Sequence, residues 1–395
     1  MVPERAYGLA SWATSLTPLT LELRPVSSSP VTSPAPAQPY GRPPLRTVHV
    51  LGGSAGDGGC AHVRSLATGL AARGVRVTVC APVAAEGEYD FTGAGARFEP
   101  DAASALRAAC AGADVVHAHG VRAGMRALLA LRGRRVPLVV SWHGDGPPAA
   151  GALGRLGRLL ERQVARAAAV VLGASSDLVD LARLRGARDA RLAPVAIPAA
   201  PEPDDPGKAR AELGVVGRPL LIAVGGLAPH RGYPVLLDAA RDWRAMDPLP
   251  LLVIAGEGPL RAELSRRIEA EGLPVRLLGH RRDAAQLLAA ADLAVLPGRG
   301  EPRAPLAQEA LRAGVPLVAA AVGGVPELVG EGAALVPYGD APALSGTVTA
   351  LLADPDRRAS LAAAGRAQAA TWPSEDDTVA QVLSVYDELM ERPRR

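Results

Sequence analysis

The chain has 395 residues, which is enough for two domains, and its net charge of +3 does not favour nucleic acid or any other strongly charged partner. The three cysteines, Cys60, Cys80 and Cys110, are widely spaced in apolar surroundings, so neither a disulfide framework nor a cysteine metal site is expected. A reducing cytoplasm therefore fits best. In addition, no apolar run approaches the length of a membrane span, and no signal-peptide pattern is expected.

The first 44 residues are rich in proline, serine and threonine and lack apolar periodicity, so we expect a disordered tail over 1–44. A buried strand is predicted at 46–51, followed by a glycine-rich turn over 52–59. A helix over about 60–73 and a strand at 76–81 complete one βαβ unit. Further strands are predicted at 114–117, 137–142, 168–172 and 191–195. Together they predict a first Rossmann-like domain over 45–200.

A proline-rich segment over 194–206 indicates an interdomain linker, after which the same pattern starts again. A strand at 220–224, a loop at 225–232 and a helix at 234–244 open the second half. Its further strands are predicted at 251–255, 275–278, 291–296, 316–320 and 333–336. Strands that alternate with helices are typical of doubly wound parallel sheets, so a second α/β domain is predicted over 207–372.

The C-terminal segment 373–392 has the pattern of an amphipathic helix. Its apolar positions recur every three or four residues, at Val379, Val382, Leu383, Tyr386 and Leu389. We expect this helix to pack across the domain junction.

Two carboxylates, Glu301 and Glu309, lie eight positions apart between a predicted strand and a predicted helix over 306–312. Loops at the carboxyl end of a parallel strand face the ligand crevice, and the N–H groups of a helix start favour an anion. One carboxylate would then bind ribose hydroxyls and the other a sugar, with a diphosphate between them. The alternative is two solvated acids near a helix N-terminus.

Glycine turns follow several predicted strands of the second half. One contains Arg231, a second begins at Gly256, and a third leads to Arg281. An arginine between strand and helix suits a phosphate. The first-half turn, with Gly58 and Gly59, lacks both the dinucleotide fingerprint and the Walker lysine, and is interpreted as a ligand loop or simply a tight turn.

Three histidines, His117, His119 and His143, come at the ends of two predicted strands. The His-x-His pair suggests zinc, but no third ligand has a spacing that supports a zinc site. A ligand-binding role for at least one histidine and a structural role for the others remain as alternatives.

A predicted helix carries four arginines and four leucines at helical spacing: Arg155, Arg158, Arg162, Arg166, Leu153, Leu156, Leu159 and Leu160. Such a helix is able to make a weak peripheral contact with an anionic membrane. We favour the alternative, a solvated charged face and a buried apolar one.

Taken together, these motifs resemble the retaining GT-B glycosyltransferases of family 4 over roughly residues 46–390. The matching segments are Val224–Gly232, Gly256–Pro259, Glu301–Glu309, Gly323–Glu327, Gly52–Gly53, Gly58–His62, His117–Gly120 and Trp142–His143. The resemblance implies two Rossmann-like doubly wound parallel-sheet domains facing a central cleft. It also implies transfer of a hexose-type sugar from a nucleotide diphosphate-sugar to an unidentified acceptor hydroxyl, without metal or other cofactor.

The resemblance assigns roles to individual residues. Glu309 would bind the ribose, Glu301 the donor sugar, Arg231 the diphosphate, and the backbone around Arg281 the base. His119, with His143 as the lesser candidate, would lie near the transferred sugar. The remaining donor-binding positions are Gly58, Gly59, Gly226, Gly256, Leu306 and Ala307.

Two positions depart from the family pattern. Gly226 stands where arginine is usual, and Pro305 has no N–H to offer a phosphate. Arg299 or Arg303 is expected to supply the missing charge. These departures leave two alternatives open, which are a degenerate nucleotide-sugar-binding protein with little turnover and another GT-B enzyme such as a phosphorylase or epimerase.

Overall fold

The computed structural model describes residues 43–52, 59–144, 151–196, 205–215, 217–299 and 304–391. The expected N-terminal tail and most of the expected linker therefore lie outside the described residues, as do Gly58, Glu301 and Arg303. Side chains at 151 and 152 are likewise not described.

The first domain is a seven-stranded parallel sheet in the order β3-β2-β1-β4-β5-β6-β7. Its strands are β1 (Arg46–Leu51), β2 (Arg76–Ala81), β3 (Arg97–Pro100), β4 (Val115–His119), β5 (Leu138–Trp142), β6 (Val170–Gly173) and β7 (Ala190–Leu192). Its helices are α1 (Gly59–Ala72), α2 (Val83–Tyr89), α3 (Ala103–Ala111), α4 (Val121–Ala130), α5 (Gly151–Ala167) and α6 (Ser176–Leu184).

The second domain is a six-stranded parallel sheet in the order β10-β9-β8-β11-β12-β13. Its strands are β8 (Leu220–Val224), β9 (Leu251–Ala255), β10 (Val275–Gly279), β11 (Leu293–Leu296), β12 (Leu317–Ala320) and β13 (Ala333–Val336). Its helices are α7 (Pro206–Leu213), α8 (Tyr233–Ala240), α9 (Arg261–Glu271), α10 (Ala284–Ala289), α11 (Pro305–Ala313), α12 (Val325–Val329), α13 (Ala341–Ala353) and α14 (Pro355–Ala369). Three 3₁₀ turns, η1 (Pro229–Arg231), η2 (Asp242–Ala245) and η3 (Gly330–Gly332), complete it.

Each sheet has an apolar layer on both faces, because successive side chains of a strand point to opposite sides. Val115 and Val116 illustrate this alternation, since one packs in each of the two core layers of the first sheet. In the second sheet, Leu221 and Ile222 are divided in the same way. Strands buried on both faces are near-continuous apolar runs, which is why the sequence predicted most of them.

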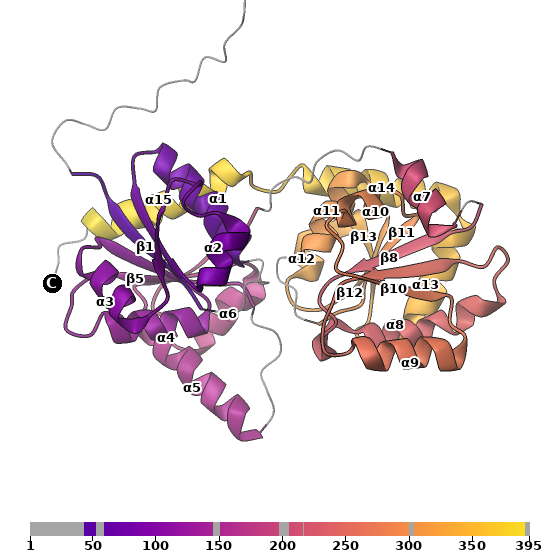
Figure 1. Cartoon of the computed structure of the whole chain (residues 1–395), viewed down its shortest axis with the longest axis horizontal. Coiled ribbons are helices and arrows are strands. Elements are labelled where there is room, and N and C mark those ends of the chain that lie inside the picture. Colours follow the sequence, from indigo (N-terminus) through magenta and orange to yellow (C-terminus); the bar gives the residue numbers. More distant parts are fainter. Residues whose placement is uncertain are drawn as a thin grey trace, which may run out of the picture. The chain divides into compact units, whose positions relative to one another are not determined.

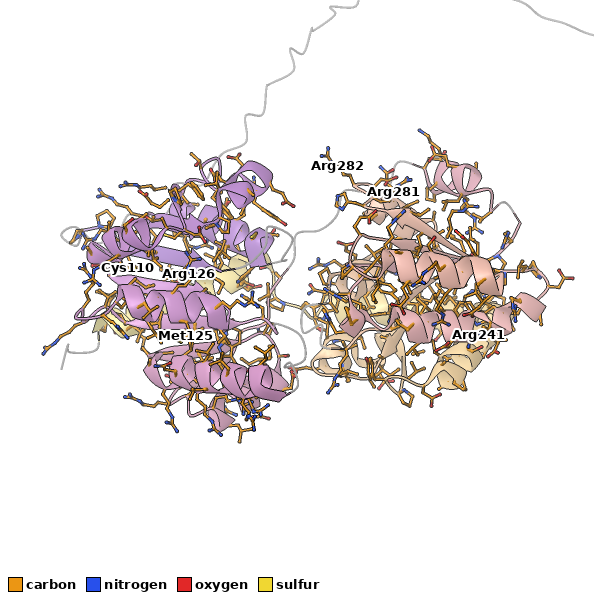
Figure 2. The ribbon with its side chains drawn as sticks, turned by 60° about the horizontal axis from the view of Figure 1, so that its bottom comes forward. Cys110, Met125, Arg126, Arg241, Arg281 and Arg282 are labelled. Atoms are coloured by element: carbon orange, nitrogen blue, oxygen red, sulfur yellow. The ribbon has the colours of Figure 1, made fainter. Side chains whose placement is uncertain are left out.

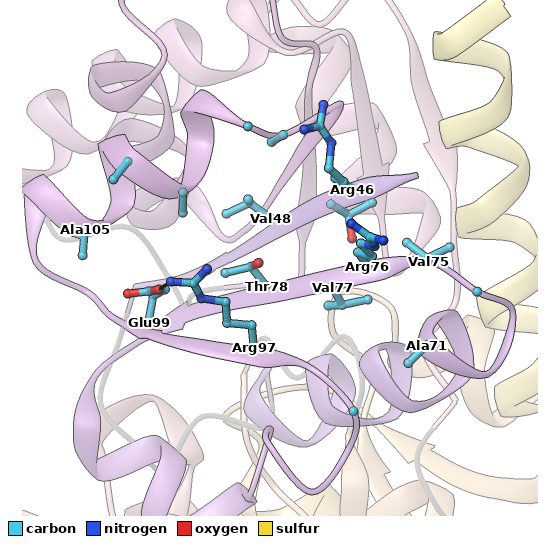
Figure 3. Close-up of a pocket in the computed structure, with 17 residues that line it drawn as sticks. Arg46, Val48, Ala71, Val75, Arg76, Val77, Thr78, Arg97, Glu99 and Ala105 are labelled. Carbon is cyan, nitrogen blue, oxygen red and sulfur yellow. Dashed lines mark ion pairs between the residues drawn. The ribbon is translucent and has the colours of Figure 1, made fainter. Parts of the chain in front are cut away.

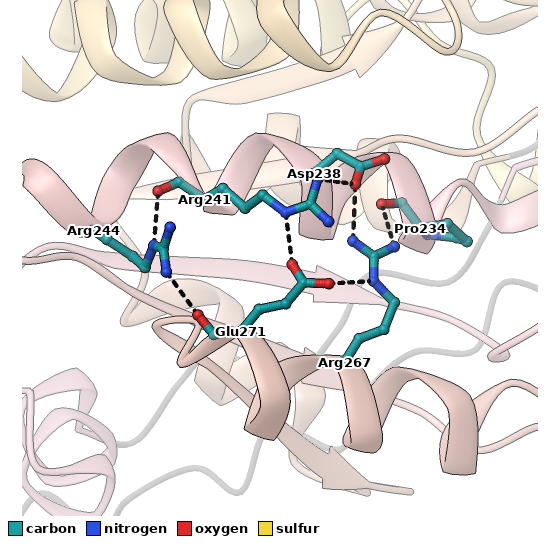
Figure 4. Close-up of polar contacts among 6 residues, drawn as sticks. All are labelled: Pro234, Asp238, Arg241, Arg244, Arg267 and Glu271. Atoms are coloured by element: carbon teal, nitrogen blue, oxygen red, sulfur yellow. Dashed lines mark hydrogen bonds and ion pairs between the residues drawn. The ribbon is translucent and has the colours of Figure 1, made fainter.

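Charged side chains also join neighbouring helices of the second domain (Figure 4). Arg267 of α9 donates to Asp238 of α8 at 2.8 Å and to Glu271 at 3.0 Å. Arg241 donates to the same Glu271 at 2.6 Å. The network links α8 to the C-terminal end of α9 on the surface of this domain.

The C-terminal helix α15 (Glu375–Glu391) has the predicted amphipathic pattern and packs beside α1 of the first domain (Figure 1). Val379, Val382 and Tyr386 belong to the apolar layer that α1 covers. The two helices approach closely at Gly69, where a Cβ would lie 2.5 Å from a Val379 methyl. The chain therefore leaves the second domain after α14 and contributes its last helix to the first domain's core.

Several local predictions differ from the structure. The strand predicted at 191–195 is β7 at Ala190–Leu192, and the strand predicted at 291–296 begins only at Leu293. The strand β3 and the helix α2 had no predicted bounds. β3 is a short edge strand of Arg, Phe, Glu and Pro, a composition that protects an edge but gives little apolar signal. The helix predicted over 234–244 ends at Ala240 and continues as the 3₁₀ turn η2.

Candidate functional site

Each sheet has one point where its strand order reverses, between β1 and β4 in the first domain and between β8 and β11 in the second. In open α/β sheets, ligands bind outside the carboxyl ends of the strands at this switch point. Most of the predicted site residues that the structure describes lie on strands and loops that end at, or next to, these points, whereas Arg281 follows β10, two strands from β8.

Hydrogen bonds join the loops at the carboxyl edge of the second sheet. The N–H of Gly225 donates to Ala255, and that of Gly256 donates to Gly279, at 3.0 and 2.8 Å. Across the switch point, the N–H of Arg299 donates to the carbonyl of His230 at 2.8 Å. The loops after β8, β9, β10 and β11 therefore form one connected rim.

Several glycines of this rim are required by the packing of one loop on another. A Cβ on Gly256 would lie 2.0 Å from the Gly225 carbonyl oxygen, and one on Gly232 would lie 2.1 Å from that of Pro297. The sequence predicted these turns as ligand-binding loops. The structure shows that their glycines are also needed for loop packing. Gly226 is different, because a Cβ there would meet only the Glu257 carbonyl oxygen at 3.8 Å, an ordinary contact.

The helix α11 begins at the switch point with Pro305 as its first residue. The preceding Ala304 is buried and has a left-handed backbone with φ 29°, a conformation that costs a residue with a Cβ some strain. The first hydrogen bond inside the helix runs from the Gln308 N–H to the Ala304 carbonyl. The amides of Leu306 and Ala307 precede it, so they are the donors that this helix start presents.

Glu309 lies in the second turn of α11 and is half-buried. Burial raises the pKa of its carboxyl group, and the nearby charge of Arg312 partly opposes that rise. A half-buried carboxylate beside a helix start is an acceptor suited to hydroxyl groups, since direct hydrogen bonds replace the water it has lost.

The arginines of the rim have different surroundings. Arg231 ends the turn η1, with a guanidinium nitrogen 4.0 Å from the position of a Cβ on Gly225. Arg299 lies over the Tyr338 ring at 5.9 Å. Arg281 pairs with Asp283 at 2.5 Å, whereas the neighbouring Arg282 extends away from the domain (Figure 2). Of these, Arg231 and Arg299 lie on the two loops that meet at the switch point.

In the first domain, the predicted histidines come together at the carboxyl ends of β4 and β5. The Nδ1 atom of His119 lies 3.3 Å from Nε2 of His143. His117 is fully buried, with Nε2 2.7 Å from the Ser141 hydroxyl and Nδ1 2.6 Å from the Tyr386 hydroxyl. His117 is therefore part of the core, and His119 and His143 are the pair nearer the edge.

Two further histidines join this group that the sequence analysis did not single out as site residues. His49 of β1 places Nδ1 3.1 Å from Nε2 of His119, and His62 of α1 lies with its ring centre 5.3 Å from that of His143. The parallel register pairs His49 with His117, and the odd positions of β1 and β4 share a face. This alternation of side chains along the strands was the sequence signal that could have placed His49 beside His117 and His119.

Burial sets the protonation state of this cluster. It lowers the pKa of His49 to about 4 and lowers the pKa of His117 and His119 well below the usual value for histidine. Neighbouring imidazoles lower the pKa of His117 and His119 further. These rings are neutral at physiological pH, so each has one donor and one acceptor nitrogen.

A cavity of about 860 Å³ lies elsewhere in the first domain, at the amino ends of the strands (Figure 3). Arg46, Arg76 and Arg97, the first residues of β1, β2 and β3, line it. Arg46 pairs with Asp114 and Arg97 with Glu99, so much of the positive charge is compensated. This cavity is at the opposite edge of the sheet from the histidines.

The helix α5 corrects one expectation. Most of its predicted apolar face is not buried, since Leu153, Leu156 and Leu159 are 72%, 52% and 59% exposed, whereas Leu160 is half-buried. The helix instead packs through small and branched residues near its C-terminal end, such as Val164 and Ala165. Leucines and arginines therefore share its solvent-facing side. Among the described residues, no helix has the combined length and apolar character needed to cross a membrane.

Two family models match the chain, one in each domain. The model described as "Glycosyl transferase 4-like domain" matches residues 57–198, and "Glycosyl transferases group 1" matches residues 207–368. A D-inositol 3-phosphate glycosyltransferase of Xylanimonas cellulosilytica is 32% identical over 316 residues, covering 71% of this chain and 73% of the relative.

A GDP-mannose-dependent alpha-(1-6)-phosphatidylinositol monomannoside mannosyltransferase of Mycolicibacterium smegmatis is 32% identical over 200 residues. That match covers 47% of this chain and 52% of the relative, so the chain spans about half of the relative's length. Among solved structures, Anabaena Alr3699/HepE in complex with UDP and glucose superposes with a TM-score of 0.76 and 21% identity. The superposition covers 87% of this chain and 100% of the Anabaena chain, and this likeness establishes the GT-B fold.

Proposed function

Because this chain belongs to family 4 of the GT-B glycosyltransferases, we propose that it transfers a hexose-type sugar from a nucleotide diphosphate-sugar to an acceptor hydroxyl with retention of configuration. The proposal includes turnover without a metal ion, and a cytoplasmic location. All three cysteines are buried thiols rather than disulfides, which is compatible with a reducing compartment.

One observation carries the proposal, which is the arrangement around α11 at the second switch point. Glu309 and the amides of Leu306 and Ala307 lie on the helix that begins where the strand order reverses. Arg231 lies on the loop across that point, tied to the start of the β11 loop through the bond from Arg299 to His230. Glu309 would accept hydrogen bonds from ribose hydroxyls, while the amides and Arg231 would hold the diphosphate.

The neutral histidines bear on how the reaction proceeds. A neutral His119 is a poor acid at physiological pH, so it is suited to hydrogen-bonding a sugar hydroxyl rather than to protonating the leaving group. Arg231 and the helix amides would instead stabilise the departing diphosphate. The diphosphate would itself take the proton from the attacking hydroxyl of the acceptor substrate. Glu301 and His143 keep their proposed roles beside the sugar.

Turnover of a donor panel is the direct test. UDP-, GDP- and ADP-sugars are incubated with the protein and a panel of hydroxyl acceptors, and NMR of the product reports the anomeric configuration. We expect one nucleotide to support transfer with retention in the presence of EDTA. A product of inverted configuration, or transfer that EDTA abolishes, would contradict the corresponding part of the proposal.

The alternative of a degenerate binding protein rests on Gly226 and Pro305, which remove one cation and one amide from the expected phosphate contacts. Tight nucleotide binding without turnover of any donor would favour it. The same assays, run with inorganic phosphate and with donor alone, distinguish a phosphorylase and an epimerase by their products.

A weak membrane contact is proposed for the exposed side of α5, which presents Leu153, Leu156 and Leu159 among arginines. Such a surface binds anionic bilayers through apolar insertion and charge attraction. We expect co-sedimentation with phosphatidylglycerol vesicles at low salt, weakened by 0.5 M salt (roughly a 4 Å Debye length) and by Arg155→Gln with Arg158→Gln. Arg183→Gln, an exposed arginine on α6, is the matched control. No binding at low salt would remove the idea.

A further inference from the structure

Five of the seven histidines of the chain gather at one edge of the first sheet. They come from β1, β4, the end of β5, and α1: His49, His62, His117, His119 and His143. The proposed sugar contact needs one or two of these rings. The presence of the others asks for a further explanation.

Three of them have the geometry of a metal triad. One ring nitrogen each of His62, His119 and His143 lies within 4.8 Å of the others. Nδ1 of His119 and Nε2 of His143 lie 3.3 Å apart. Two imidazoles bound to one tetrahedral zinc ion at about 2.0–2.1 Å have nitrogens roughly 3.4 Å apart. The pair is therefore already at a separation that two ligands of one ion would have.

The three rings differ in orientation. His119 and His143 are nearly parallel, with 3° between their planes, whereas His62 stands at 74° and 75° to them. His143 is only partly buried, which gives an ion access from outside. The three ligands would leave a fourth tetrahedral position for water or an anion.

Hydrogen bonds behind His119 supply the proton arrangement that a metal needs. If Nδ1 of His119 binds an ion, its proton resides on Nε2, which faces Nδ1 of His49 at 3.1 Å. His49 then donates from Nε2 towards the Tyr386 hydroxyl at 3.5 Å, and that hydroxyl donates to His117 Nδ1 at 2.6 Å. His117 finally donates from Nε2 to Ser141 at 2.7 Å. Every bond in this order has one donor and one acceptor, and such outer hydrogen bonds orient metal-binding histidines.

A second triad, made of His49, His117 and His119, is less suitable. These three rings are almost completely inaccessible, and the nitrogens of His117 already face Tyr386 and Ser141. An ion between them would have to displace those bonds, whereas the first triad uses them as support.

We infer that His62, His119 and His143 form a binding site for a divalent transition-metal ion, with Zn²⁺ the best match to three imidazole ligands. Such an ion would bind the ring of His119, which the proposed reaction needs beside the sugar. Binding therefore inhibits transfer. The inhibition rests on the proposed function, whereas the metal site itself does not.

The site is tested first by binding alone. Zn²⁺ is titrated into the metal-free protein in competition with a chromophoric chelator, and Co²⁺ is added separately to record its visible spectrum. We expect one ion per chain and the intense absorption of tetrahedral cobalt. Binding to His62→Ala or His143→Ala should be at least about tenfold weaker. His280→Ala, an exposed histidine of the second domain, should bind as the unchanged protein does.

The inference is overturned if the unchanged protein binds no stoichiometric ion, or if His62→Ala binds as tightly as the His280→Ala control. Because His62 is buried, His62→Gln serves as a second variant that keeps more of the side-chain volume. The cobalt spectrum of the unchanged protein requires no variant, and a weak octahedral spectrum counts against the site.

An activity measurement then separates the two proposals. Transfer is assayed over a Zn²⁺ series, with each protein compared with its own zinc-free rate. We expect inhibition of the unchanged protein and a shift of the inhibition curve by at least about tenfold in His62→Ala. Zinc binding without transfer from any donor would defeat the proposed function alone. Transfer without zinc binding would defeat the metal site alone.

Discussion

The hydroxyl of Tyr386 and Nδ1 of His117 lie 2.6 Å apart, both fully buried, although 269 residues separate them in the chain. Tyr386 belongs to the C-terminal helix and His117 to the fourth strand of the first sheet. The bond makes α15 part of the first domain's core. It also connects this helix to the histidines at the sheet edge.

Tyr386→Phe should destabilise the first domain, because the substitution leaves a buried imidazole nitrogen without its hydroxyl. An unsatisfied buried polar group costs about 1–3 kcal/mol. Urea unfolding measures the difference, and Tyr338→Phe is the control, since Tyr338 is 41% exposed. Equal stability of Tyr386→Phe and the unchanged protein would show that the bond contributes little.

Glu271→Gln should lower the melting temperature at pH 6 but not near pH 2. Hydrogen bonds from Arg241 and then Arg267 lower the pKa of Glu271 to about 2 (Figure 4). A folded-state pKa below the unfolded value contributes stability that is present above about pH 4.3 and is lost as the pH falls towards 2.

The measurement is a pair of thermal melts of the variant and the unchanged protein across that range. Glu263→Gln on the same helix α9 is the matched control, since neither of these arginines contacts Glu263 among the interactions described. A difference between Glu271→Gln and the unchanged protein that does not change with pH would contradict the ion-pair explanation.

Most of the fold was predictable because its strands are buried on both faces. The strands β2, β8, β9 and β13 have the predicted bounds, since each is a short apolar run between turn signals. The edge strand β3 lacked that signal. The end of α8 was misplaced because the helical backbone continues through Arg241 into the 3₁₀ turn η2, which sequence periodicity does not distinguish from an α-helix.

The site was only partly predictable, because sequence spacing does not reveal which strand ends meet. The sequence placed His119 and His143 at strand ends, and the family resemblance implied that they lie near the transferred sugar. The contacts of His119 with His49, and of His143 with His62, depend on the parallel register of β1 with β4 and on the packing of α1. Likewise, the sequence predicted Gly256 as a donor-binding residue. The structure shows that glycine is also needed there for packing, because the Gly225 carbonyl fills the space that a Cβ would occupy.

Gly226→Arg should increase the affinity for nucleoside diphosphates. A Cβ at this position has room, and the backbone is not left-handed, so the substitution restores the family's cation without strain. A charge-assisted hydrogen bond to phosphate is worth about 1.5–3 kcal/mol, or roughly tenfold to a hundredfold in the dissociation constant. Isothermal titration with UDP and GDP measures it.

Two variants control the Gly226→Arg experiment. Gly226→Gln has a long side chain without the charge and should change affinity little. Gly256→Ala should lose stability, because its Cβ would lie 2.0 Å from the Gly225 carbonyl oxygen. Unchanged affinity in Gly226→Arg would mean that the side chain at 226 does not reach the diphosphate, and the explanation based on a missing cation would fail.

Glu309→Gln should stabilise the protein at neutral pH while weakening nucleotide binding. Burial raises the folded-state pKa of Glu309, so the unfolded chain loses this proton first as the pH rises. The ionised carboxylate therefore lowers stability above about pH 4.3, and glutamine removes that cost. The variant's melting temperature should exceed that of the unchanged protein at pH 7, with a smaller difference at pH 4.

The same carboxylate is the proposed acceptor for ribose hydroxyls, so its replacement should weaken binding of the preferred nucleoside diphosphate. Hydrogen bonds to a charged group are worth about 1.5–3 kcal/mol, which corresponds to roughly tenfold to a hundredfold in affinity. The 2′-deoxy nucleotide should bind the unchanged protein less tightly and lose little more in Glu309→Gln. Glu331→Gln, an exposed acid in η3, controls for general charge. If Glu309→Gln still distinguishes ribose from deoxyribose as the unchanged protein does, another residue recognises the ribose.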